Sequence, residues 1–198
     1  MTFNLMIAGV GGQGTVLASK LIAAAAMKKG YDVRTTETIG MAQRGGSVFG
    51  HVRIGAGGMG CGANIFSPLI PLGKVDVIIA FEPAEAVRQM TYLRDNGVVL
   101  ACDSAVKPTA DPKGSSYEAA AVIDFLKSHA PRSILLDGKR LTARNAKTLN
   151  VALLGAAAQS GILPFDADTL METLYEVLPQ RLLEMNIKAF ELGKELCP

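Results

Sequence analysis

The first thirty residues constrain the fold of this chain more than any other stretch. Residues 3–8 are mostly apolar and typical of a buried strand, and the run Gly9-Val10-Gly11-Gly12-Gln13-Gly14 follows them directly. Residues 15–29 then carry apolar side chains at the spacing of one helical face. A turn this tight between a strand and a helix needs positions without a Cβ atom. The chain therefore opens with the first half of a βαβ unit, which predicts an α/β fold.

The glycine turn is itself a candidate binding site. Gly9, Gly11 and Gly14 have the spacing found in dinucleotide-binding domains. Glu37 lies at the end of the next predicted strand, where such domains place an acid that binds ribose. The first turn of the following helix also presents unpaired N–H groups that can hold an anion. A turn that only lets the helix and strand pack closely explains the same glycines, so both interpretations stay open at this point.

The rest of the chain alternates strands with helices and then becomes helical. Further strands are predicted at residues 31–37, 47–54, 75–81, 98–102 and 133–136. Helices are predicted after Pro83 and at residues 117–129, about 141–160, 166–179 and 180–195. This order predicts an open, mostly parallel sheet flanked by helices, with a helical C-terminal tail and residues 1–198 in a single domain.

Local signals add three expectations about this sheet. The strand at 31–37 should run parallel to the first strand. The strand at 47–54 alternates apolar and polar residues and should lie at or near a sheet edge. Leu93 should belong to the apolar stripe of the preceding helix, and Asn96-Gly97 should turn the chain into the next strand.

The composition argues against several classes of protein. The formal net charge is +2, which is too balanced to indicate nucleic-acid binding, and the absence of tryptophan leaves few rings for stacking on bases. No apolar run approaches the roughly 20 residues of a membrane span. The N-terminus lacks the basic region and cleavage site of a signal peptide. We therefore expect a cytoplasmic protein that binds neither nucleic acid nor a membrane.

Cysteine and histidine are too few and too scattered to predict a metal centre. The cysteines are Cys61, Cys102 and Cys197, and no C-x-x-C occurs. An iron–sulfur cluster needs about four thiolates, and a structural zinc ion needs a comparable set of cysteines and histidines. The two histidines, His51 and His129, are also far apart in the sequence. We expect no metal ligands in this chain, reduced thiols, and a His51 that packs or is solvated rather than binding a ligand.

One group of basic residues has no acid within it. It consists of Lys139, Arg140, Arg144 and Lys147. On a continuous helix, Arg140, Arg144 and Lys147 would share a face. Such a face is either solvated or meets a partner or a phosphate, and the sequence does not separate these two interpretations.

The segment after the second strand carries a more specific signal. Residues 41–48 read Met-Ala-Gln-Arg-Gly-Gly-Ser-Val, a polar Gln-Arg pair beside glycines at the mouth of the predicted sheet. Together with the glycine turn, this segment resembles the gamma-type domain of the 2-oxoacid:ferredoxin oxidoreductases, and within that family the indolepyruvate-oxidising branch. The resemblance covers nearly the whole chain. It includes the runs at 67–71, 81–86, 150–155 and 186–193.

The resemblance implies an enzyme subunit without redox centres. In this family a larger subunit binds thiamine diphosphate and carries the [4Fe–4S] clusters. The complex would oxidatively decarboxylate indolepyruvate or another aryl pyruvate with coenzyme A, giving an aryl-acetyl-CoA and CO₂, and pass electrons to ferredoxin. This chain would shape the active site, exclude water and contribute to holding the phosphates of coenzyme A. It would supply no catalytic residue of its own.

The residues expected to contact the cofactor or the larger subunit come from two segments. They are Gly9, Gly11, Gly12, Gln13 and Gly14 in the glycine turn, and Gln43, Arg44, Gly45 and Gly46 in the second segment. The alternative is a stand-alone NAD(P)- or flavin-binding oxidoreductase or regulatory domain that uses the glycine turn and Glu37. Only this alternative predicts measurable nucleotide affinity in the isolated chain. The 2-oxo acid itself is not readable from this sequence, because its pocket would lie mostly in the partner.

Overall fold

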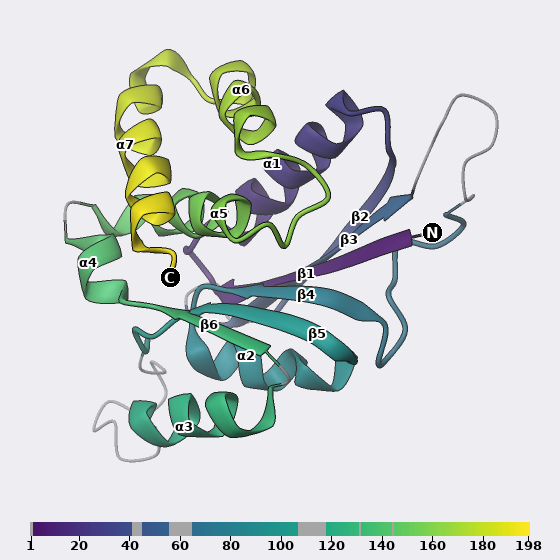
Figure 1. Ribbon diagram of the computed structural model, residues 1–198, viewed down its shortest axis with the longest axis vertical. Helices are drawn as coiled ribbons and strands as arrows, with labels where there is room; N and C mark the ends of the chain where they lie inside the picture. The colour runs from purple at the N-terminus through teal and green to yellow at the C-terminus, as the bar shows by residue number, and fades with distance from the viewer. Residues whose placement is uncertain (1, 41–44, 56–64, 107–117, 131, 144) are drawn as a thin grey trace.

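The computed structural model describes residues 2–40, 45–55, 65–106, 118–130, 132–143 and 145–198. These residues form an open sheet with helices on both faces, as predicted (Figure 1). The strands lie in the order β2 (Asp32–Ile39), β3 (Ser47–Gly55), β1 (Thr2–Val10), β4 (Val75–Ala80), β5 (Leu93–Cys102) and β6 (Arg132–Leu136). Strand β3 runs antiparallel to both of its neighbours, whereas β1, β4, β5 and β6 pair in parallel.

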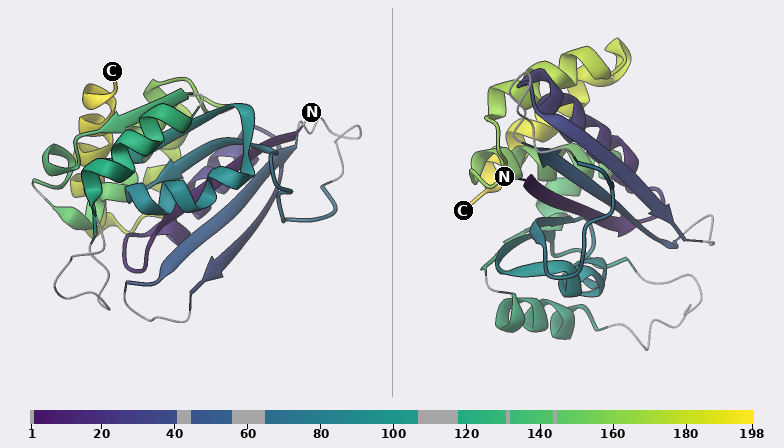
Figure 2. Two further views of the ribbon diagram at one scale, coloured as in Figure 1. Left: turned by 90° about the horizontal axis from the view of Figure 1, so that it is seen from below. Right: turned by 90° about the vertical axis from the view of Figure 1, so that its right-hand side faces the viewer.

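Helices cover the sheet in two layers (Figures 1 and 2). One face carries α1 (Thr15–Lys28), α5 (Leu149–Gln159), α6 (Ala167–Val177) and α7 (Gln180–Leu196), and the other carries α2 (Pro83–Gln89) and α3 (Ala119–His129). A short helix α4 (Gly138–Thr142) and two 3-10 turns, η1 (Met90–Tyr92) and η2 (Ala146–Thr148), lie in the connections. The C-terminal helical tail is therefore confirmed as part of one helical layer.

The middle of the sheet is buried on both faces. In β1, Leu5 and Ile7 join the core under α1 and α5, while Met6 and Ala8 join the core under α2 and α3. All four side chains are fully buried. A strand covered on both sides reads as a continuous apolar run rather than an alternating one, and this is the pattern of residues 3–8.

Two glycines allow α5 and α7 to cross with their backbones in contact. A Cβ atom at Gly155 would lie 2.1 Å from the carbonyl oxygen of Phe190, and one at Gly193 would lie 1.8 Å from that of Ala152. Real Cβ atoms do not approach so closely, so both positions require glycine. The runs at 150–155 and 186–193, which carried part of the family resemblance, meet at this crossing.

Strand β2 has the predicted direction but not the expected neighbour. It runs parallel to β1, yet β3 lies between them because β2 and β3 form an antiparallel hairpin. The physical reason is the short connection: a parallel crossover needs a dozen or more residues, and far fewer separate Ile39 from Ser47. Strand β3 is second from the sheet edge, which agrees with the expectation for residues 47–54.

The predicted turn at Asn96-Gly97 does not precede the strand, because β5 already begins at Leu93. Both residues lie inside β5, where the pairing with β4 shifts between Val75–Leu93 and Val77–Val98. Five residue steps of β5 there face two of β4, and a Cβ atom at Gly97 would lie 3.0 Å from the Arg94 carbonyl oxygen. The chain therefore bends locally at Asn96-Gly97 and continues as the same strand. Leu93 begins this strand, and the preceding helix has already ended at Gln89.

The single helix predicted at about 141–160 is wrong, because three elements replace it: α4, η2 and α5. Asn145 has an extended backbone, and its side chain accepts a hydrogen bond from the Lys147 backbone N–H at 2.9 Å. Asparagine favours such caps over helix interiors, which explains the break. Arg140 and Lys147 therefore do not share one helical face, and Arg144 lies outside the described residues.

Candidate functional site

The carboxyl ends of the parallel strands share one edge of the sheet, called the carboxyl edge below. It includes the ends of β1, β4, β5 and β6, and also the start of β3, since Ser47 pairs with Val10. In Figure 1 this edge lies away from the N label, on the side of α4. Open α/β sheets place their ligand sites at such an edge. The glycine turn and the residues after position 44 both reach it.

The glycine turn closes the gap between β1 and α1. Gly12 and Gly14 have φ values of +99° and +80°, the left-handed region that favours glycine. Gln13 connects two strands: its side-chain Oε1 accepts from the Val10 N–H at 2.7 Å, and its Nε2 donates to the Phe81 carbonyl at 3.2 Å. This side chain fills the space beside Gly9, where a Cβ atom would lie 2.9 Å from Oε1. The absence of a side chain at Gly9 therefore leaves the space that the Gln13 side chain occupies.

Asn150 supports the turn from the helical layer. Its side chain is buried, and Nδ2 donates to the Gly14 carbonyl oxygen at 3.2 Å. A Cβ atom at Gly14 would lie 2.3 Å from this nitrogen. The start of α5 therefore packs directly on the start of α1, and any side chain at position 14 would push the two apart. Sequence reasoning noted the run at 150–155 without expecting this contact.

The segment after position 44 packs against the glycine turn. The Gly11 N–H donates to the Gly46 carbonyl at 2.8 Å, and the Gly40 N–H donates to the Ser47 carbonyl at 2.9 Å. Gly45 adopts a φ of +76°. The structure thus joins Gly46 to the glycine turn, with Gly45 directly before it in the chain. The other two expected residues, Gln43 and Arg44, lie outside the described residues.

Two buried carboxylates complete this cluster. Glu85 accepts from the Ser47 hydroxyl at 2.5 Å and forms an ion pair with Arg88. Glu82 caps α2 by accepting from the Glu85 N–H at 2.9 Å, and it also accepts from the Val106 N–H at 3.4 Å. Both side chains are only 2% exposed. Acids are favoured at a helix N-terminus, because the N–H groups there lack partners within the helix. Sequence reasoning missed this pair, although Glu82-Pro83 directly after a buried strand was an available signal.

Cys102 ends β5 at the carboxyl edge, and its thiol is expected to be unreactive. Burial is the main cause that raises the pKa of its thiol to about 11. The neighbouring Asp103 accepts from the Gly138 N–H at 2.7 Å, and a Cβ atom at Gly138 would lie 2.4 Å from the Cys102 sulfur. A thiol that is protonated and tightly packed is neither a nucleophile nor a ready metal ligand.

The geometry does not match a dinucleotide site. Glu37 pairs with Gly50, which pairs with Ile7, so it lies two strands from β1 and level with the middle of that strand. Two strand spacings amount to about 10 Å. In the turn itself, the N–H groups of Gly11 and Gln13 already donate to the Gly46 and Val10 carbonyls. The antiparallel β3 thus separates the acid from the glycines that would have to act with it.

The comparison with protein families decides between the oxidoreductase family and a stand-alone nucleotide-binding domain. The family model described as pyruvate ferredoxin/flavodoxin oxidoreductase matches residues 4–196. The chain belongs to this family.

Several curated members of the oxidoreductase family resemble the chain over nearly its full length. Indolepyruvate oxidoreductase subunit IorB of Archaeoglobus fulgidus is 36% identical, covering 98% of this chain and 94% of the relative. The subunit of the same name from Pyrococcus horikoshii is 35% identical, with coverage of 96% and 94%. The pyruvate/ketoisovalerate oxidoreductases common subunit gamma of Thermococcus kodakarensis is more distant, at 28% identity over 92% of this chain and 90% of the relative.

Solved structures of the oxidoreductase family share the fold. The gamma subunit of a keto/oxoacid ferredoxin oxidoreductase from Geobacter sulfurreducens has a TM-score of 0.67 at 19% identity and covers 98% of both chains. The 2-oxoglutarate:ferredoxin oxidoreductase of Magnetococcus marinus has a TM-score of 0.70 at 20% identity, covering 99% of this chain but 31% of its own. At these identities the likeness shows the fold alone.

The described residues of this oxidoreductase family member form neither a metal centre nor a membrane-spanning helix. In that part of the chain, no group of three or more His, Cys, Asp or Glu side chains is arranged to hold a metal ion. None of the helices described there is long and apolar enough to cross a membrane. His51 is buried between the rings of Phe49 and Tyr92, with ring centroids 5.7 Å away in each case. It packs, as expected.

Proposed function

We propose that this chain is the smaller subunit of a cytoplasmic 2-oxoacid:ferredoxin oxidoreductase and that it completes an active site carried mainly by a larger subunit. Residues 1–198 would act as one gamma-type domain. The observation that carries the proposal is the hydrogen bond from the Gly11 N–H to the Gly46 carbonyl, which joins the two segments of the family resemblance at the carboxyl edge. Glycine-rich segments that are remote in sequence, partly exposed, and meet at such an edge are typical of a site rather than of packing alone.

The proposed substrate is indolepyruvate or another aryl pyruvate. The relatives named indolepyruvate oxidoreductase subunit IorB are 33–36% identical to this chain, whereas those named common subunit gamma of pyruvate/ketoisovalerate oxidoreductases are 25–28% identical. Coenzyme A would be the co-substrate and ferredoxin the electron acceptor. The difference in identity supports the aryl branch of the family.

The redox cofactors of such a complex do not fit the described part of this chain. An iron–sulfur cluster needs about four thiolates, and Cys102 is packed against Gly138 with a raised pKa. We therefore assign the [4Fe–4S] clusters and thiamine diphosphate to the larger subunit. This chain would orient the bound groups and exclude water from them, and we assign no proton transfer to its residues.

Arg44 is the residue we propose to act at the boundary with the larger subunit, together with its neighbour Gln43. Both ends of their segment are held at the carboxyl edge: Gly40 and Ser47 pair through their backbones, and Ser47 is fixed by the buried Glu85. A guanidinium offers a planar fork of donors that suits a carboxylate or a phosphate better than the point charge of a lysine. Arg44 would hold such an anionic group on the larger subunit or beside its active site.

The test is a pair of measurements on Arg44→Ala and Arg44→Lys. Arg44→Ala should weaken assembly with the larger subunit, or turnover of the complex, by roughly 2–5 kcal/mol if a buried anionic partner is left unpaired. Arg44→Lys should give a smaller loss. Both variants should leave the melting temperature of the isolated chain nearly unchanged. Normal assembly and turnover would remove Arg44 from the site, and a much lower melting temperature would make its role structural.

A further inference from the structure

A pocket of about 400 Å³ lies between α7 and the connection formed by α4 and η2. Leu141, Met185 and Leu192 provide apolar walls, and Thr148 also lines the pocket. Leu141 and Thr148 are buried, whereas Met185 and Leu192 are partly exposed. The pocket is therefore a concave apolar surface that opens to solvent, of a size that holds a large side chain with room to spare.

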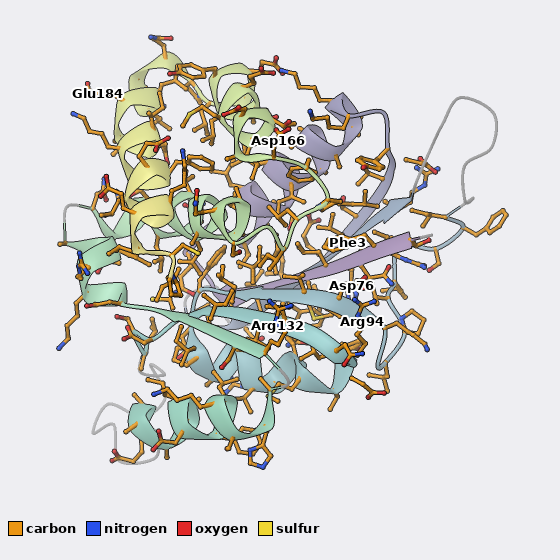
Figure 3. All side chains as sticks on the ribbon, viewed as in Figure 1. Phe3, Asp76, Arg94, Arg132, Asp166 and Glu184 are labelled. Atoms are coloured by element: carbon orange, nitrogen blue, oxygen red, sulfur yellow. The ribbon has the colours of Figure 1, made fainter. Side chains whose placement is uncertain are left out.

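Besides Lys188, which pairs with Glu184, the elements around this pocket carry four exposed cations. They are Lys139 and Arg140 of α4, Lys147 of η2 and Arg181 of α7. Within the described ranges of the chain, none of these four side chains forms an ion pair or a hydrogen bond. Glu184, on the outward side of α7 (Figure 3), is neutralised by Lys188 at 2.5 Å. Glu191 pairs with Lys194, and Glu195 lines the adjoining hollow together with Arg140, so the surroundings of the pocket keep a small net positive charge.

A second group of cations in the same helical layer, Lys28 and Lys29, is paired with acidic side chains. Lys28 bonds to Glu172 and Glu176, both at 2.7 Å, and Lys29 lies 3.3 Å from Asp166. These bonds connect the end of α1 to α6 and leave little net charge there. Charges that a protein leaves unpaired together on one surface are typical of a surface that meets an opposite charge on a partner.

We propose that this pocket and its four cations bind an acidic segment of the larger subunit, with one apolar side chain of that segment seated in the pocket. This inference rests on the proposed function. A free phosphate would use the cations but leave the apolar walls in water, whereas an acidic segment with an apolar anchor uses both features. The position also fits one partner: α4 follows the carboxyl end of β6, and Thr148 lies two residues before Asn150, which holds the glycine turn.

The experiment compares two double charge reversals in the purified chain. The test variant is Arg140→Glu with Arg181→Glu, and the matched control is Lys20→Glu with Lys127→Glu, which are exposed lysines of α1 and α3. Both variants change the net charge by the same amount. Binding to the purified larger subunit is measured by calorimetry at about 50 mM and about 400 mM NaCl, because salt screens exposed charges.

We expect the Kd of the test variant to rise about tenfold or more at low salt, and much less at high salt, while the control variant binds like wild type. Met185→Gln, which makes one pocket wall polar at nearly constant length, should weaken binding equally at both salt concentrations.

Equal binding by the test and control variants would overturn the proposal. So would inorganic pyrophosphate binding that depends on Arg140 and Arg181 without any effect of these residues on assembly, or self-association of the chain that the reversal abolishes. Wild type that does not bind the larger subunit at all would overturn the proposed function as well.

Discussion

The amino edge and the carboxyl edge of the sheet both bury polar side chains, but the two groups hold different parts of the chain. At the amino edge, Asp76 accepts from the Asn4 N–H at 2.7 Å and pairs with Arg94 at 2.5 Å (Figure 3). Arg53 donates to the Asn4 side chain at 3.1 Å and to the carbonyls of Ser67 and Leu69. This network links the strand ends of the amino edge to residues 67–69, which lead into β4. All of these bonds join the sheet to that one connection or to itself.

At the carboxyl edge, the polar side chains hold the ends of the segments that carry the family resemblance. Gln13 fixes the glycine turn to β4, and Ser47 with Glu85 fixes the chain directly after residues 41–44. We propose that the amino edge serves stability and that the carboxyl edge serves assembly. Changes at the first should lower the melting temperature of the isolated chain, whereas changes at the second should impair the complex more than the fold.

The largest expected effect on stability is that of Asp76→Ala. This change removes the acceptor of a buried backbone N–H and the partner of Arg94, which should cost about 2–3 kcal/mol of unfolding free energy. Asp76→Asn keeps an oxygen for the Asn4 N–H and should cost less. Chemical denaturation of the isolated chain measures both. Assembly of the Asp76→Ala variant at a temperature where it is folded should match wild type, and a selective loss of assembly would break the comparison.

Ser47→Ala should show the opposite pattern. Loss of one hydrogen bond to Glu85 should lower the unfolding free energy by about 1 kcal/mol, while binding to the larger subunit should weaken about tenfold because residues 41–44 lose an anchor. The matched control is Ser67→Ala at the amino edge, where the hydroxyl accepts from the Leu69 N–H at 3.2 Å. Calorimetry that found equal binding losses for the two serine variants would remove the distinction between the edges.

The smallest expected effect is a pH dependence of stability from His51, which lies midway along β3 opposite Met6. Burial lowers the pKa of His51, whose Nδ1 accepts from the Ile70 N–H at 3.3 Å. The unfolded chain takes up a proton near pH 6.5, whereas folded His51 resists protonation. The contribution of His51 to stability is therefore complete above pH 6.5 and falls as the pH drops from there toward the lowered pKa. His51→Asn keeps an acceptor and should abolish this part of the pH dependence of unfolding. An unchanged dependence would assign it to other groups.

The sequence predicted the layers of the fold better than the order of the strands. The spacing of apolar residues and the positions of the glycines predict β1, α1 and most later elements, because these signals are local in the sequence. The place of β3 between β2 and β1 depends on pairing across the sheet, although the short connection before Ser47 already indicated an antiparallel hairpin. The turn signal at Asn96-Gly97 marked a local bend inside β5 rather than the start of a strand, and at Asn145 a cap interrupted a continuous apolar pattern.

The sequence motifs named the segments of the candidate site but not the contacts between their residues. Gly11 and Gly46 were expected in one site because of the resemblance, and the structure brings them within hydrogen-bonding distance. The roles of Gln13, Glu85 and Asn150 were not foreseen, because each depends on a partner that is remote in sequence: Phe81, Ser47 and Gly14 respectively. No periodicity or spacing in a single sequence reports such pairs.

Reconstitution of the enzyme from separate subunits tests the central claim most directly. The purified chain and the larger subunit, which we propose carries thiamine diphosphate and the clusters, are assayed for ferredoxin reduction with indolepyruvate and coenzyme A. Each is assayed alone, and the two are mixed at increasing ratios. We predict no turnover from this chain alone and turnover that rises with added chain until the two subunits are equivalent. Turnover by the isolated chain, or turnover by the larger subunit that this chain does not change, would contradict the account.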